Sequence, residues 1–182
     1  VPEKTDATTW WARAALWVMF VVWGMYFIHG GVDWEVVGGS FMHAVNLPFH
    51  EFGHVLFSPF GRFLTILGGS LFQVLLPLML GGVFVFQQRD NFAASITLWW
   101  CGQSFIDLAP YIDDAKARAI PLVGGRGEEA HDWGNLLTMF NAVEHAHGIA
   151  RFSFLMGTGF MILAWVWGAT LLRQQRKFLA EV

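Results

Sequence analysis

The sequence has little charge and almost no cysteine, and both shortages limit what the protein can be. Charged residues make up 14% of the 182 residues, against about 25% in ordinary soluble domains. Cys101 is the single cysteine, which excludes an intramolecular disulfide and a cysteine-based zinc site. The net charge of −3 and the lack of a basic patch argue against a nucleic-acid-binding role.

Apolar residues take the place of the missing charge. They form 55% of the chain, with 18 Phe and 10 Trp. The charged residues gather between long apolar runs, which is typical of membrane proteins. The aromatic residues suit a lipid-facing surface with belts at both membrane interfaces. At this length, and without repeats, we expect a single membrane-embedded domain over residues 1–182 that contacts the lipid bilayer.

The apolar runs predict an all-α polytopic membrane protein. Five of them are clear candidate spans: residues 11–28, 36–60, 63–86, 92–108 and 152–172. The first run lacks a small-x-small cleavage site, so we interpret it as a retained span and not as a signal peptide.

Basic residues predict how the chain crosses the membrane. They lie near both ends of the chain, at Lys4, Arg13, Arg173, Arg176 and Lys177. The positive-inside rule then puts both termini in the cytoplasm, and we expect a bacterial inner-membrane protein. Both termini inside requires an even number of crossings, so residues 134–150 would form a sixth segment. The alternative for this stretch is an amphipathic or re-entrant helix.

The second apolar run contains the sequence His50-Glu51-Phe52-Gly53-His54. On a helix, His50 and His54 lie one turn apart on the same face, so both imidazoles can bind one metal ion. Zinc lowers the pKa of a bound water to about 7, and the neighbouring Glu51 can accept the proton as that water attacks. The motif therefore predicts a Zn²⁺ site with Glu51 as the catalytic base. The other interpretation is a histidine pair that hydrogen-bonds between helices.

Residues on both sides of the motif predict an interrupted helix. Asn46 could cap a helix and Pro48 suits its first turn, whereas Ser58-Pro59 and Gly61 would end it. Such a helix is too short to cross a bilayer alone. An interrupted helix at membrane depth is tolerated where it lines a polar cavity, and hydrolysis needs water to reach the metal.

The motif and two further stretches resemble the site-2 protease family of intramembrane zinc metalloproteases. Gly69-Ser70-Leu71-Phe72-Gln73 resembles the family's Gly-Pro-x-x-Asn element, with Ser70 in place of Pro and Gln73 in place of Asn. The stretch from Asp107 through Pro110 to Asp114 resembles the family's Asn-x-x-Pro…Asp-Gly element, with Ala115 in place of Gly and the spacing one residue short.

The resemblance covers a core of about residues 40–120, which precedes C-terminal helices expected over residues 134–172. It implies a membrane-embedded zinc metalloprotease that cleaves the transmembrane segments of other proteins. It also implies that Asp114 is the third zinc ligand and that Gln73 contacts the substrate.

The third ligand has alternatives, because a catalytic zinc takes three protein ligands and a water. Asp107 lies deeper in its span, where a carboxylate invites a functional interpretation. His131 could fold back as a ligand or as a transition-state donor. His43 would lie about 10 Å along the helix from His50, too far to share the metal.

Two other regions permit two interpretations each. Residues 63–67 could be a membrane-level strand, as in the resembling family, that pairs with an unwound substrate, or simply the start of the third helix. Glu144, His145 and His147 would be functional if residues 134–150 cross the membrane, and solvated surface groups if they do not.

Other functions compete with proteolysis. The chain could be a non-catalytic subunit of a membrane complex that uses the same histidines for structural zinc, or that binds haem through histidines from two helices. It could also be a zinc hydrolase of lipid or of another small molecule, because the motif specifies water activation and not the electrophile.

Overall fold

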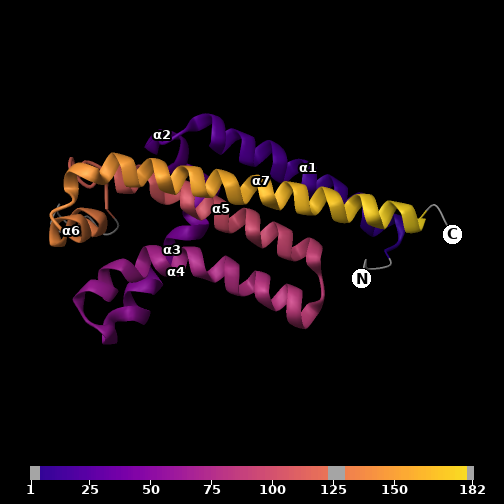
Figure 1. The fold of residues 1–182 in the computed structure, drawn as a ribbon, viewed down its shortest axis with the longest axis horizontal. Helices are drawn as coiled ribbons and strands as arrows, with labels where there is room; N and C mark the ends of the chain where they lie inside the picture. Colours follow the sequence, from indigo (N-terminus) through magenta and orange to yellow (C-terminus); the bar gives the residue numbers. More distant parts are fainter. Residues whose placement is uncertain (1–4, 123–129, 180–182) are drawn as a thin grey trace.

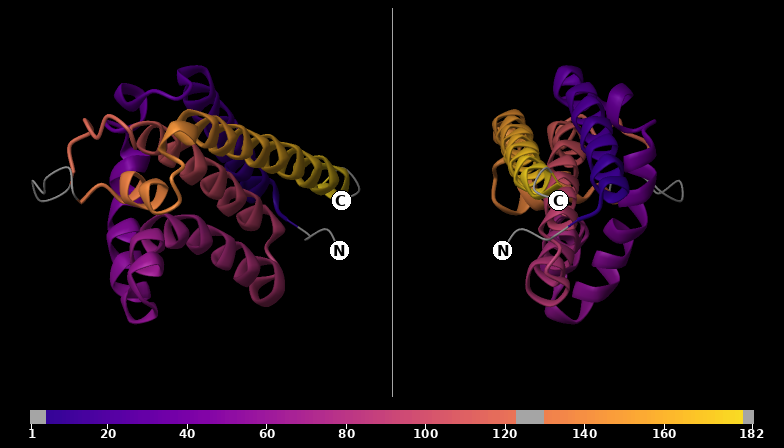
Figure 2. Two further views of the ribbon diagram at one scale, coloured as in Figure 1. Left: turned by 60° about the vertical axis from the view of Figure 1, so that its left-hand side comes forward. Right: turned by 90° about the vertical axis from the view of Figure 1, so that its right-hand side faces the viewer.

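The computed structural model describes residues 5–122 and 130–179, and every regular element in them is helical. The elements are α1 (Ala7–Gly30), α2 (Trp34–Val37), α3 (Phe41–Phe57), η1 (Ser58–Phe60), α4 (Arg62–Val83), η2 (Phe84–Gln88), α5 (Asn91–Asp113), α6 (Asp132–Met139), η5 (Val143–His145) and α7 (Ala146–Leu179). Helix α5 lies between α7 and α4, and α1 packs on α7 (Figure 1). The views in Figure 2 show the same order, with α3 and α4 on the side of α5 away from α7.

Three helical stretches are long and apolar enough to cross a membrane: Ala7–Gly30, Arg62–Gln88 and Val143–Leu179. They correspond to the first, third and last predicted spans and indicate a membrane protein. Helix α5 falls short of that apolar composition because it is the central helix. Its polar residues, Ser95, Thr97, Gln103, Ser104 and Asp107, are buried against protein, which a lipid-facing helix could not tolerate.

The prediction of a sixth crossing over residues 134–150 is wrong. Helix α6 is only eight residues long and ends before Asn141, whose φ of 53° lies in the left-handed region. Asparagine tolerates that conformation and stops helices. A 3-10 turn follows, and the chain then joins α7, which runs on to Leu179 without a break. With three apolar helices in the described ranges, a total of about six spans is not supported.

Helix α3 begins earlier than predicted. Ser40 caps it by accepting a hydrogen bond from the His43 N–H at 3.0 Å, so Pro48 lies inside the helix and not in its first turn. Asn46 is not a cap, because its side chain bridges Trp100 Nε1 at 2.8 Å and Gln103 Oε1 at 2.7 Å on α5.

The predicted end of this helix is confirmed. Helix α3 stops at Phe57, η1 contains Pro59, and Gly61 has a φ of 92° that favours glycine. Residues 63–67 belong to α4, so the first turns of a helix are formed there and not a strand.

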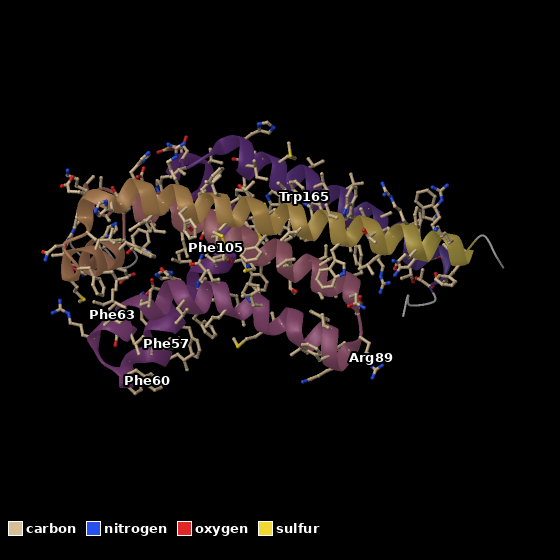
Figure 3. All side chains as sticks on the ribbon, viewed as in Figure 1. Phe57, Phe60, Phe63, Arg89, Phe105 and Trp165 are labelled. Carbon is tan, nitrogen blue, oxygen red and sulfur yellow. The ribbon has the colours of Figure 1, made fainter. Side chains whose placement is uncertain are left out.

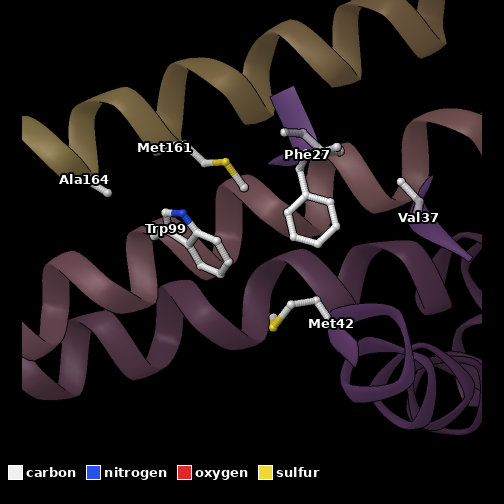
Figure 4. Close-up of a cluster of buried hydrophobic side chains, with 7 residues drawn as sticks. Phe27, Val37, Met42, Trp99, Met161 and Ala164 are labelled. Atoms are coloured by element: carbon white, nitrogen blue, oxygen red, sulfur yellow. The ribbon is translucent and has the colours of Figure 1, made fainter. Parts of the chain in front are cut away.

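A buried apolar cluster holds α1, α2, α3, α5 and α7 together at the centre of the bundle (Figure 4). It comprises Phe27, Val37, Met42, Trp99, Ile106, Met161 and Ala164. Helices α5 and α7 touch backbone to backbone, because a Cβ on Gly102 would lie 2.6 Å from the Gly157 carbonyl oxygen. The outer surface is rich in large apolar side chains, among them Phe60 and Phe63 at the end of the α3–α4 hairpin (Figure 3), as expected of a lipid-facing surface.

Candidate metal centre

The His-Glu-x-x-His motif lies where α3 and α4 approach most closely. A Cβ on Gly53 would collide with the Gly68 carbonyl oxygen of α4, so only glycine permits this contact. At this contact one face of α3 packs against α4, and both motif imidazoles point towards Gly69. A Cβ on Gly69 would lie 2.6 Å from the Nε2 atom of His50 and 2.6 Å from that of His54. Because Gly69 has no side chain, both imidazoles pack directly against α4 at this position.

Asp132, from the first turn of α6, completes a three-residue group with the two histidines. Its Oδ2 lies 3.2 Å from His50 Nε2 and 3.2 Å from His54 Nε2, and the three donor atoms all lie within 4.8 Å of one another. Tetrahedral zinc bonds of about 2.0–2.1 Å place two donor atoms about 3.3–3.4 Å apart. The carboxylate and the imidazoles therefore have the spacing of ligands that share one ion.

The opposite side of each imidazole supports the same conclusion. His54 Nδ1 lies 2.8 Å from the Thr65 carbonyl oxygen, which can only accept, so Nδ1 carries the proton. His50 Nδ1 lies 3.0 Å from Gln73 Oε1. With the Nδ1 protons turned away, each Nε2 faces the Asp132 carboxylate, and a metal ion or a proton has to lie between nitrogen and oxygen. Two histidines and one carboxylate are a donor set that zinc accepts.

Tyr111 of α5 positions Asp132. Its hydroxyl donates to Asp132 Oδ2 at 3.2 Å and accepts from the Asp132 N–H at 2.9 Å. Its ring lies edge-on to that of His50, with ring centroids 6.1 Å apart. The end of α5 is thereby tied to the beginning of α6 beside the two motif histidines.

Glu51 lies beside the group in a shared cavity. It is exposed, and it lines a cavity of about 540 Å³ together with both motif histidines. Apolar residues of the wall include Leu47, Val55, Ile66 and Leu108, and polar ones include Tyr111, Asp107 and Asn135. A group that binds in this cavity meets apolar surface and the Glu51 carboxylate together.

Asp114, the predicted third ligand, lies outside this group. Its oxygens accept hydrogen bonds from the N–H groups of Ala119 and Ile120 at 3.0 and 2.9 Å, and Oδ2 lies 3.3 Å from His131 Nε2. Its carboxylate therefore closes the turn after α5. Asp132, and not Asp114, supplies the carboxylate beside the two histidines.

The other candidates for the third ligand also lie next to the group but not in it. His131 is fully buried and caps α6, with Nδ1 accepting from the Gly134 N–H at 3.0 Å. Burial lowers the pKa of His131, although the Asp114 carboxylate acts in the opposite direction. Asp107 and Gln73 contact each other, with Gln73 Nε2 donating to Asp107 Oδ2 at 2.8 Å.

Sequence reasoning missed Asp132 because it followed the spacing of the resembling family. The available signal was its position in a polar stretch that was already expected to fold back at His131. The cluster at Glu144, His145 and His147 proves to be exposed. It is tied to α5 and the turn after it by surface ion pairs, Lys116–Glu144 at 2.7 Å and His147–Asp113 at 2.9 Å, which contribute little.

No protein-family model matches this chain, and comparisons with curated proteins and with solved structures find no significant similarity. Function therefore has to be inferred from the geometry and chemistry of the site.

Proposed function

We propose that this chain is a membrane-embedded zinc metalloprotease in which His50, His54 and Asp132 hold the ion. The observation that carries the proposal is the position of Asp132 Oδ2, 3.2 Å from the Nε2 atoms of both motif histidines. Gly69 supports it, because only a glycine there lets both imidazoles approach the same carboxylate oxygen. Zinc in such a site supplies an activated water at neutral pH.

Glu51 is the acid–base group of the proposed reaction. Its carboxylate accepts a proton as the water oxygen attacks the carbonyl carbon, and it returns that proton to the leaving nitrogen as the C–N bond breaks. The apolar wall of the cavity accepts the side chains of a transmembrane substrate segment. Tyr111 keeps Asp132 in place through two hydrogen bonds.

The proposal also covers the substrate and the membrane in which the protein lies. The substrate is a transmembrane segment of another protein, and the bilayer is that of a bacterial inner membrane. Both termini face the cytoplasm. The three long apolar helices support a membrane location, and the basic residues after the last apolar run support a cytoplasmic C-terminus. The start of α1 lies at the same end of the bundle, because Trp10 Nε1 donates to the Leu172 carbonyl oxygen at 2.9 Å.

The decisive experiment combines metal analysis with Glu51→Gln. The purified protein should contain about one zinc per chain. Glu51→Gln should keep that zinc and lose cleavage of a single-span membrane protein by about 10²-fold or more, the usual contribution of a general base. Glu144→Gln is the matched control, because it neutralises an exposed carboxylate far from the motif histidines in sequence, and it should retain both zinc and cleavage. Cleavage that survives Glu51→Gln would refute the assignment.

A non-catalytic metal-binding subunit is the second candidate, and the exposed Glu51 in the cavity speaks against it, because structural zinc needs no base. Haem suits the site less well. Two axial ligands approach the iron from opposite sides, whereas His50 and His54 project from one helix towards the same Asp132 oxygen. A hydrolase of lipids or of another small molecule would use the same zinc ligands and Glu51. Assays of peptide, lipid and small-molecule substrates, each with Glu51→Gln as the inactive control, distinguish these activities.

A further inference from the structure

A chain of buried polar side chains lies behind His50, on the side away from Asp132. His50 Nδ1 lies 3.0 Å from Gln73 Oε1 of α4. Gln73 Nε2 donates to Asp107 Oδ2 of α5 at 2.8 Å. Asp107 Oδ1 lies 3.1 Å from Nδ1 of His43. His43 belongs to α3, so these contacts link α3, α4 and α5. Gln73 is 3% exposed and Asp107 is 4% exposed, so water has little access to these contacts.

The carboxylate of Asp107 determines which groups donate and which accept along this row of polar side chains. An ionised carboxylate only accepts hydrogen bonds, so the Gln73 amide must present its NH₂ group to Asp107 and its oxygen to His50. The amide oxygen in turn selects the His50 tautomer that has its proton on Nδ1. In this tautomer the lone pair of His50 Nε2 is available to a metal ion and faces Asp132. Without Asp107, the amide could turn round and favour the tautomer that cannot bind metal.

A buried carboxylate here requires a reason beyond helix packing. A charge at membrane depth is costly and persists mainly where it has a function. Helices α3 and α5 are already joined one turn away by a neutral pair, with Asn46 Nδ2 donating to Gln103 Oε1 at 2.7 Å. The neutral pair shows that an acid is not needed to join these helices.

We propose that Asp107 and Gln73 are positioning residues that fix the tautomer and orientation of His50 and thereby determine the zinc affinity of the site. The inference depends on the proposed function in one respect, namely that the site holds zinc. Partners of metal-bound histidines typically change metal affinity by about 10–100-fold. Gln73 is then not the substrate contact that the family resemblance implies.

The first test compares two substitutions of the same kind in the detergent-purified protein of residues 1–182. Gln73→Met removes the acceptor for His50 Nδ1, whereas Gln103→Met removes an equally buried amide that accepts from Asn46 and lies outside the polar chain behind His50. Zinc affinity is measured by competition with a chromophoric chelator. Gln73→Met should bind zinc about 10–100-fold more weakly, and Gln103→Met should stay within about threefold of the wild type, well below that range.

The second test exchanges the two groups. Gln73→Glu combined with Asp107→Asn keeps every donor opposite an acceptor, because the carboxylate introduced at position 73 would accept from His50 and the amide introduced at position 107 would donate to that carboxylate. This double variant should restore zinc affinity to within about threefold of the wild type, whereas Gln73→Glu alone, with two carboxylates in contact, should lose about 10-fold or more. A merely structural role of these two residues would not predict this recovery of zinc affinity. If Gln73→Met fails to fold, the double variant still tests whether Gln73 and Asp107 position His50.

The outcomes separate the two proposals. Zinc bound normally by the wild type and by Gln73→Met would overturn this inference and leave the proposed function intact. Equal losses in Gln73→Met and Gln103→Met would overturn it as well, because they would indicate a general packing defect. A wild-type protein that binds no zinc would overturn both.

Discussion

Replacing Asp132 by Asn tests whether the structure has identified the third ligand. The substitution keeps the shape of the side chain and removes the charge that faces His50 and His54. In the folded protein Asp132 Oδ2 contacts both Nε2 atoms and the Tyr111 hydroxyl, each at 3.2 Å. The backbone hydrogen bond from residue 132 to Tyr111, 2.9 Å long, does not depend on the carboxylate.

The size of the effect follows from these contacts. Loss of a partner that only orients a ligand costs about 10–100-fold in metal affinity. Loss of the ligand itself should therefore exceed about 100-fold, which corresponds to about 2.8 kcal/mol of binding free energy. The fold should suffer much less, because the hydrogen bond with Tyr111 is worth about 1 kcal/mol. Zinc affinity and stability should thus respond very differently to the same substitution.

The assay pairs zinc competition with thermal unfolding of the metal-free protein in detergent. Asp114→Asn is the matched control, because Asp114 is the carboxylate that the family resemblance favours, and it should leave zinc affinity within about threefold, short of the change expected for a residue that supports a ligand. Strong zinc binding by Asp132→Asn, together with loss of zinc from Asp114→Asn, would refute the assignment of Asp132.

Three further substitutions test the packing that builds the site. Gly69→Ala places a methyl group 2.6 Å from both motif Nε2 atoms, so zinc affinity should fall by more than about 100-fold, beyond the change expected for an orienting partner, in a protein whose helical circular dichroism is unchanged. Gly53→Ala forces α3 away from the Gly68 carbonyl oxygen and should lower the free energy of unfolding by about 1–3 kcal/mol. Thermal melting measures this change, and an unchanged midpoint would contradict the close helix contact. Trp100→Phe leaves the buried Asn46 Oδ1 without its 2.8 Å donor and should cost about 1–3 kcal/mol without changing zinc affinity, and a loss of zinc would contradict its purely structural role.

The sequence alone was sufficient for features that depend on neighbouring residues. Helix periodicity puts His50 and His54 on one face whatever their surroundings, and the long apolar runs identify helices α1, α4 and α7. The stop at Ser58-Pro59 and Gly61 follows from backbone geometry. These predictions succeed because the forces that decide them act within a few residues.

Local signals failed where tertiary contacts decided the outcome. Asn46 and Pro48 look like a helix start, but Asn46 is occupied by Trp100 and Gln103 of α5, and Ser40 caps the helix instead. Residues 134–150 look long enough to be a crossing, yet a left-handed Asn141 divides them. A hydropathy count also cannot show that α5 is surrounded by protein.

Tertiary structure alone decided which carboxylate lies beside the two histidines. Asp132 is 82 residues from His50 in the sequence, and no local pattern distinguishes it from Asp107, Asp113 or Asp114. The fold selects it by packing α6 against α4 and α5 and by anchoring it on Tyr111. The sequence determined that the two histidines share one face of a helix, because 3.6 residues per turn align positions four apart. Which carboxylate meets them depends on how separate helices pack, and that is a property of the whole chain.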